Sequence, residues 1–207
     1  MTTEQLEQLA LAKRILAGRE WLTFDELSDK AKARAVENYC QHLDYWDESI
    51  RSELRCDLEK AGVYRPKLSY SGFSSQGDGA HFTGDYSYAA GWRSWFGDGD
   101  GMPSLYEAVS GLAALQARYF YQLQATITHR GHYQHENCTR IDVYRRDDKA
   151  VSAETAEELA ELLRDLMRAC YKELEAEYDY STGEGAYETL SNSEDEFHED
   201  GRSYTRP

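Results

Sequence analysis

Apolar positions at helical spacing and strong helix-forming residues mark the N-terminal part of the chain. Gly18 and Gly62 follow two such segments, as glycines often do at helix C-termini. Residues Thr23–Glu26 have the spacing of a capping box, and Ser28 is placed to cap a helix that begins just after it. These signals predict three helices, over residues 3–17, 29–43 and 47–61.

The middle of the chain changes to an alternation of apolar and polar residues. A glycine-rich segment, Gly72–Gly79, separates the first two alternating stretches, and Arg130-Gly131 separates the last two as in a hairpin. Pro103 suits the first turn of a helix that reaches about residue 117. The pattern predicts four strands, over residues 67–71, 80–88, 119–128 and 133–145.

The C-terminal part returns to helical spacing. Residues 152–180 predict one long helix, and residues 184–197 predict a shorter, acidic one. The long helix carries an apolar stripe whose side chains we expect to be buried: Leu159, Leu162, Leu163 and Leu166.

Helical ends around a β-rich middle indicate an α+β fold. We expect one domain with an antiparallel sheet of about four strands, covered by helices, with strands near Leu68, Phe82, Leu123 and Ile141. Its expected parts are a helical segment, a mostly β segment, an acidic helical segment and a tail: residues 1–62, 63–150, 151–200 and 201–207.

Composition narrows the class of protein. A hydrophobic content of 41% and a charged content of 29% are typical of a folded protein and not of a disordered one. No apolar run approaches the ~20 residues of a membrane helix, and the first residues lack the pattern of a signal peptide. Four scattered cysteines without a C-x-x-C pair favour reduced, mostly buried thiols. We therefore expect a soluble, intracellular protein.

The net charge of −15 is concentrated near the C-terminus, where residues 151–207 hold 16 Asp and Glu against 5 Lys and Arg. Such a surface repels nucleic-acid phosphates and attracts a basic protein, although acidity also simply favours solubility. Spaced carboxylates can imitate a phosphate backbone. The candidate partner-binding residues are Glu154, Glu157, Glu158, Glu161, Asp165, Glu194, Asp195 and Glu196.

The glycine-rich segment is a second candidate site, through Ser75, Gln76 and Asp78. It lacks the Lys-Ser/Thr of a phosphate-binding loop and the G-x-G-x-x-G of a dinucleotide site. Structural glycines are the alternative: we expect a positive φ at one or more of Gly72, Gly77 and Gly79, and a turn capped by the Asp78 side chain.

A histidine-rich stretch is a candidate zinc site, through His129, His132, His135 and Cys138. A two-residue hairpin loop would place His129 and His132 across the turn. A three-residue loop would place His129 and His135 on one face and pair Tyr121 with Ile141. Plain polar hairpin residues are the alternative.

Asp98–Gly101 resembles half of a calcium loop but lacks the later ligands, which favours a surface turn.

No nucleophile elbow, triad spacing or H-E-x-x-H occurs in the chain. Together with the absence of a cofactor motif, this favours a non-enzymatic protein without a cofactor. Sixteen tyrosines favour a binding role, because tyrosine is common at interaction surfaces.

The chain resembles a family of small bacteriophage and prophage accessory proteins, some of which are labelled antitoxins. The segments that carry the resemblance are 23–28 with 30–32, 71–80 with 82–84, 126–133, 174–178, and 196–197 with 200–201. The most specific of them is S-G-F-x-S-Q-G-D-G-A-x-F, which begins at Ser71. The resemblance implies a phage-encoded protein in the cytoplasm of a bacterial host.

Three functions follow as expectations. The first is an inhibitor of a CRISPR- or restriction-type defence protein, binding its basic nucleic-acid-handling surface. The second is an antitoxin that neutralises a toxin by direct contact, and the third is an enzyme or zinc protein that uses the histidine stretch. The expected partner is a basic bacterial protein, with no direct contact to nucleic acid or membrane, and a homodimer is left open.

Overall fold

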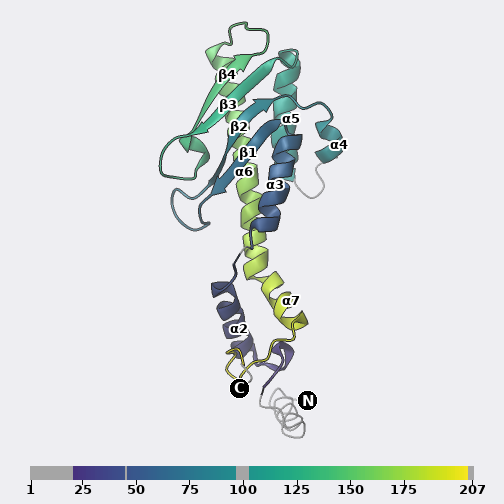
Figure 1. Ribbon diagram of the computed structural model, residues 1–207, viewed down its shortest axis with the longest axis vertical. Coiled ribbons are helices and arrows are strands. Elements are labelled where there is room, and N and C mark those ends of the chain that lie inside the picture. The colour runs from purple at the N-terminus through teal and green to yellow at the C-terminus, as the bar shows by residue number, and fades with distance from the viewer. Residues whose placement is uncertain (1–20, 45, 97–102, 205–207) are drawn as a thin grey trace. The chain divides into compact units, whose positions relative to one another are not determined.

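The computed structural model describes residues 21–44, 46–96 and 103–204 (Figure 1). The expected helix over residues 3–17 and the turn at Asp98–Gly101 lie outside these ranges. The chain divides into two compact units. We call residues 47–177 the β unit, and residues 1–46 with 178–207 the helical unit.

The β unit contains a four-stranded antiparallel sheet. Its strands are β1 (Val63–Tyr70), β2 (Ala80–Ser87), β3 (Leu123–His129) and β4 (Thr139–Arg145). Their order in the sheet follows the order in the chain, and every neighbouring pair is antiparallel. The predicted α+β fold is therefore confirmed.

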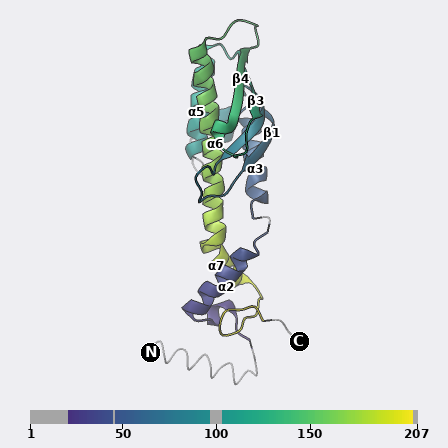
Figure 2. The same ribbon diagram turned by 90° about the vertical axis from the view of Figure 1, so that its left-hand side faces the viewer.

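Helices cover the apolar face of this sheet. They are α3 (Glu48–Lys60), α5 (Pro103–Arg118) and α6 (Ala153–Thr182), whose last residues, from Tyr178, count with the helical unit. The short helix α4 (Trp92–Phe96) packs beside α5. Figure 2 shows α5 and α6 lying side by side along the sheet. Phe82 and Leu123 from the strands share one core with Leu112 from α5 and Leu163 from α6.

The apolar stripe of α6 is buried as predicted at Leu159, Leu163 and Leu166, which have no exposed area. The prediction is wrong for Leu162, which is only partly buried. Its side chain lies over Gly111 of α5, where an added Cβ would approach the Leu162 Cδ2 to 2.8 Å. Leu162 therefore lies at the margin of the contact between α5 and α6.

Strand β1 begins four residues earlier than predicted. Pro66 lies within it, at a shift of register between Tyr64 and Lys67, and Arg65 has a positive φ of 52°. Because β1 is an edge strand with a bulge at this point, the missing N–H of proline breaks no necessary ladder bond.

The tight hairpin predicted at Arg130-Gly131 is wrong. Residues 130–138 form a longer connection between β3 and β4 that ends in a short 3-10 helix, η2 (Glu136–Cys138). Ile127, and not Tyr121, is the partner of Ile141. The Arg130 N–H donates to the Cys138 carbonyl at 2.7 Å and closes the ladder at the end of β3.

The helical unit is built from η1 (Phe24–Glu26), α2 (Asp29–Gln41), α7 (Glu184–Asn192) and the end of α6. The predicted capping box at Thr23 is present, and the Ser28 hydroxyl accepts a hydrogen bond from the Ala31 N–H at 3.3 Å. Phe24, Ala35, Leu190 and Phe197 belong to the apolar core of this unit.

The predicted helix over residues 184–197 ends early, at Asn192. Phe197 instead forms isolated β-bridges with Leu22 and Ser203. Gly201 (φ +84°) packs against the backbone of α2, where an added Cβ would lie 2.1 Å from the Ala31 carbonyl oxygen. The segment after α7 therefore packs on the helical unit as far as Ser203.

Within the described ranges no helix is long and apolar enough to cross a membrane.

The expectation of mostly buried thiols is wrong: Cys170 is buried, Cys40 and Cys138 are half-buried, and Cys56 is exposed.

Candidate functional site

The glycine-rich loop between β1 and β2 is held by its own groups. Gly77 has a φ of +100°, and the Asp78 Oδ2 accepts hydrogen bonds from the N–H groups of Ser74 (3.0 Å) and Ser75 (2.7 Å). Both expectations for this loop, a positive-φ glycine and an Asp78 cap, are confirmed. The Asp78 carboxylate is engaged within the turn, while Ser75 and Gln76 are exposed.

The histidine stretch does not gather its side chains into one site. The His129 Nε2 lies 3.0 Å from the Tyr133 carbonyl oxygen, and the His135 Nδ1 lies 3.2 Å from the Asn137 nitrogen at the start of η2. His132 is exposed, and Cys138 lies under Gly131. Among the described residues, no three His, Cys, Asp or Glu side chains come together in a way that would hold a metal ion.

His81 is a buried histidine that the sequence reasoning missed. Its side chain is 3% exposed, its ring stacks on His129 with centroids 4.1 Å apart, and its Nδ1 has no hydrogen-bond partner. Burial, and then the neighbouring His129, lower the pKa of His81 to about 4. The alternation of β2 carried no signal for this, because His81 lies on the face opposite to Phe82.

This lowered pKa predicts a loss of stability in mild acid. Between pH ~6.5 and ~4 the unfolded chain binds a proton at His81 that the folded chain does not, so the free energy of unfolding falls as pH falls. We expect His81 to account for about 1–3 kcal/mol of that fall. Urea unfolding of the wild type and of His81→Leu at pH 7 and pH 4.5 isolates this contribution. An equal loss in both proteins would contradict the assignment.

The acidic stripe expected on α6 is exposed but ion-paired. The Arg164 Nη1 lies 3.2 Å from Glu157 and 3.1 Å from Glu161, and the Arg168 Nη2 lies 2.7 Å from Asp165. The Arg168 and Arg164 guanidiniums, which donate hydrogen bonds to Glu161, hold the pKa of that carboxyl below its ordinary value.

Two further arginine contacts extend this network. Arg118 of α5 pairs with Glu158, and the Arg168 Nη1 lies 3.2 Å from the Glu136 Oε1 of η2. Glu154, in the first turn of α6, is the exposed member of the stripe without a described ion pair. A basic partner that docked on this stripe would have to compete with the arginines that already pair with it.

The helical unit carries the more strongly unbalanced charge. Its described residues, 21–44, 46 and 178–204, contain 13 Asp and Glu against 4 Lys and Arg, whereas residues 47–177 contain 22 against 15. Asp200 pairs with Arg34 at 3.0 Å and with Arg202 at 2.8 Å, which occupies two of the four cations. Glu194 and Asp195 are exposed beyond α7, and Glu196 is half-buried.

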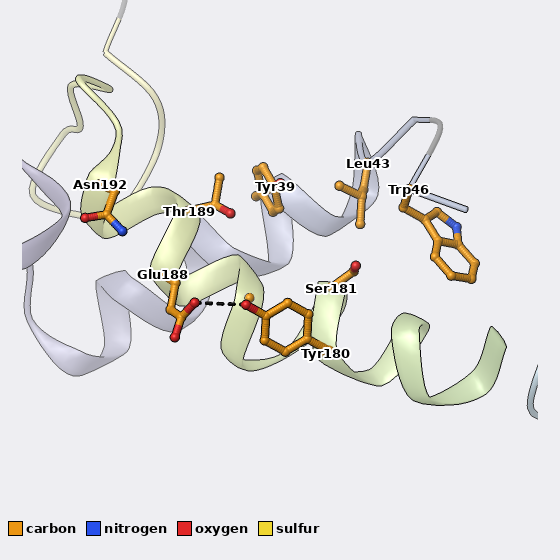
Figure 3. Close-up of a pocket in the computed structure, with 9 residues that line it drawn as sticks. Tyr39, Leu43, Trp46, Tyr180, Ser181, Glu188, Thr189 and Asn192 are labelled. Atoms are coloured by element: carbon orange, nitrogen blue, oxygen red, sulfur yellow. Dashed lines mark hydrogen bonds between the residues drawn. The ribbon is translucent and has the colours of Figure 1, made fainter. Parts of the chain in front are cut away.

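A cavity of about 540 Å³ opens between α2 and α7 in this acidic unit (Figure 3). Tyr39, Leu43 and Trp46 line it from α2 and the segment that follows. The end of α6 and α7 supply the opposite wall: Tyr180, Ser181, Gly185, Glu188, Thr189 and Asn192. The Tyr180 hydroxyl donates a hydrogen bond to the Glu188 Oε2 at 2.9 Å.

Contacts behind the cavity fix its walls. The Trp46 ring meets the Tyr178 ring edge-on, with centroids 5.3 Å apart, and the Cys40 thiol donates to the Thr182 carbonyl at 3.5 Å. Gly185 lies against the Tyr180 ring, where an added Cβ would come within 2.7 Å of the ring. The sequence reasoning missed this cavity, because its two walls lie about 140 residues apart in the chain and neither contains a motif.

Comparison with known proteins identifies a family without a described activity. No curated protein and no solved structure matches the chain. A family model described as a domain of unknown function, DUF8835, matches residues 33–184. The match extends from α2 to the start of α7, which is well over half of the chain. The chain therefore belongs to the DUF8835 family.

Proposed function

We propose that this protein is a non-catalytic binding protein that engages a basic protein partner through the helical unit. The observation that carries the proposal is the charge of that unit, 13 carboxylates against 4 cations over residues 21–44, 46 and 178–204. A surface of one sign raises the rate of encounter with a partner of opposite sign and orients the partner as it approaches.

The ion pairs of α6 are the reason for choosing this surface over the acidic stripe. Arg164 and Arg168 already satisfy Glu157, Glu161 and Asp165, so a partner gains little by approaching them. A cation of the partner would therefore stabilise exposed carboxylates such as Glu194 and Asp195 more than the paired carboxylates of α6. The same negative field disfavours direct binding of DNA or RNA, because phosphates carry the same sign.

The resemblance to phage accessory proteins narrows the partner class within this proposal. It favours a host defence protein with a basic nucleic-acid-handling surface, so the protein would act as an inhibitor by occupying that surface. An antitoxin that binds its toxin directly is the second candidate. The two differ in the origin of the partner: a defence protein is encoded by the host, whereas a toxin is encoded beside its antitoxin.

Capture at controlled salt tests the proposal. The full chain is immobilised and exposed to bacterial lysate at about 50 mM salt, and bound protein is eluted at about 200 mM. We expect a basic protein to be retained at low salt, to elute at the higher salt, and to be displaced by added DNA or RNA that competes for its basic surface. Retention that is independent of salt, or retention of acidic proteins alone, contradicts the proposal.

A further inference from the structure

We propose that the cavity between α2 and α7 binds one arginine side chain of the partner. This inference rests on the proposed function, which supplies a basic protein, and adds the place where one of its side chains is recognised. The cavity combines aromatic side chains with a carboxylate, the two groups that bind a guanidinium: Tyr39, Trp46, Tyr180 and Glu188.

The aromatic side chains suit a flat cation. Tyr39 and Trp46 come from the α2 side and Tyr180 from the end of α6, so rings line the space from both walls (Figure 3). A cation within about 6 Å of a ring face gains about 0.5–2 kcal/mol, and a guanidinium also stacks on the ring. The edge-on contact of Trp46 with Tyr178 limits the freedom of the indole before any ligand arrives.

Glu188 supplies the charge for this site. Its Oε2 already accepts the hydrogen bond from the Tyr180 hydroxyl, which holds the carboxylate beside the ring. The remaining acceptor capacity of the carboxylate and the side-chain oxygen of Asn192, which also lines the cavity, match the several N–H donors of a guanidinium. An ammonium has only three donors and no flat face, so we infer arginine and not lysine as the occupant.

The surroundings favour a cation over a neutral ligand. Among the described residues, none of the nine that line the cavity is basic, and the helical unit around it is strongly acidic. A volume of about 540 Å³ lies within the usual range for ligand sites and leaves room for residues beside the arginine. The occupant is therefore an arginine carried on a segment of the partner's chain.

Titration of the full chain with two small probes tests this inference. Nα-acetyl-arginine amide carries the guanidinium, and Nα-acetyl-citrulline amide is its neutral isostere. We expect the arginine probe, followed by NMR, to shift the Trp46 indole N–H and the Gly185 amide, and the citrulline probe to shift neither. Equal shifts with both probes, or no shift at these positions, would overturn the inference.

Two matched variants separate a specific contact from a general field. Glu188→Gln removes the carboxylate from the cavity, whereas Glu37→Gln removes the same charge from an exposed position of α2 that does not line it. We expect the first to weaken the arginine probe about tenfold and the second less than about twofold, since a hydrogen bond to a charged group is worth about 1.5–3 kcal/mol. Equal weakening by both variants overturns the site, because it reports the field alone.

These results are distinguishable from a failure of the proposed function. If the probe does not bind the cavity while capture of a basic partner remains salt-sensitive, the cavity inference fails and the acidic docking surface stands. If the probe binds with the expected selectivity but the chain captures no basic protein, the binding site stands and the partner class is wrong.

Discussion

Replacing Leu163 with alanine is expected to lower the free energy of unfolding of the β unit by about 2–5 kcal/mol. The Leu163 side chain has no exposed area and lies in the core that α6 shares with the sheet. Alanine removes the branched end of the side chain, and close-packed neighbours on α5 and the strands cannot collapse fully into the space. Urea unfolding followed by circular dichroism measures the change.

Lys172→Ala is the matched control for this substitution. Lys172 lies on the same helix but is exposed, and surface changes of this kind usually stay within about 0.5 kcal/mol. A loss below about 1 kcal/mol for Leu163→Ala, or an equal loss for both variants, would show that α6 is not packed on the sheet as described.

Local signals predicted much of the fold because they act over a few residues. Ser28 caps α2 through a neighbour three residues away, and Gly62, with a φ of +99°, ends α3 where a side chain would meet the Ser87 carbonyl. The spacing of leucines on α6 likewise placed three of four predicted residues in the core. Leu162 differs because its burial depends on its contact with α5, at Gly111, and helical spacing within α6 does not reveal a contact with another helix.

The connection between β3 and β4 was mispredicted for a non-local reason. Arg130-Gly131 resembles a tight turn, and a three-residue loop there would pair Tyr121 with Ile141. Tyr121 is not available for this pairing, because Phe120 and Tyr121 adopt left-handed conformations, with φ of 53° and 60°, and β3 begins only at Leu123. The buried Gln116 side chain fixes this start, since its amide donates to the Leu123 carbonyl at 2.8 Å and accepts from the Leu123 N–H at 3.3 Å. Nothing in the alternation of the strands reveals this contact from α5.

The candidate site was only partly predictable for the same reason. Spacing alone correctly places the α6 carboxylates on one exposed face, but it does not show that Arg118 from α5 reaches Glu158. The cavity requires α2 and α7 to meet, and the residues that meet are separated by most of the chain. Net charge along the sequence located the acidity, while only the contacts between residues show which carboxylates are already paired.

Reversing three exposed carboxylates of the helical unit is expected to weaken binding of the captured partner at least about 100-fold. The variant is Asp179→Lys, Glu194→Lys and Asp195→Lys, none of which lines the cavity between α2 and α7. Each reversal replaces an attraction to a basic surface with a repulsion, and close charge pairs across interfaces are coupled by about 1.5–7 kcal/mol. Affinity is measured by calorimetry at about 150 mM salt, with thermal unfolding as a check on folding.

The matched control reverses the same amount of charge on α6, through Glu157→Lys, Glu158→Lys and Glu161→Lys. These carboxylates already pair with Arg118, Arg164 and Arg168, so their loss releases arginines and removes little that a partner uses. We expect this variant to bind within about fivefold of the wild type, which is the change that long-range charge alone gives at this ionic strength. If the α6 reversal abolishes binding and the helical-unit reversal does not, the partner docks on the ion-paired stripe, and the carboxylates of α6 imitate a phosphate backbone by displacing their own arginines.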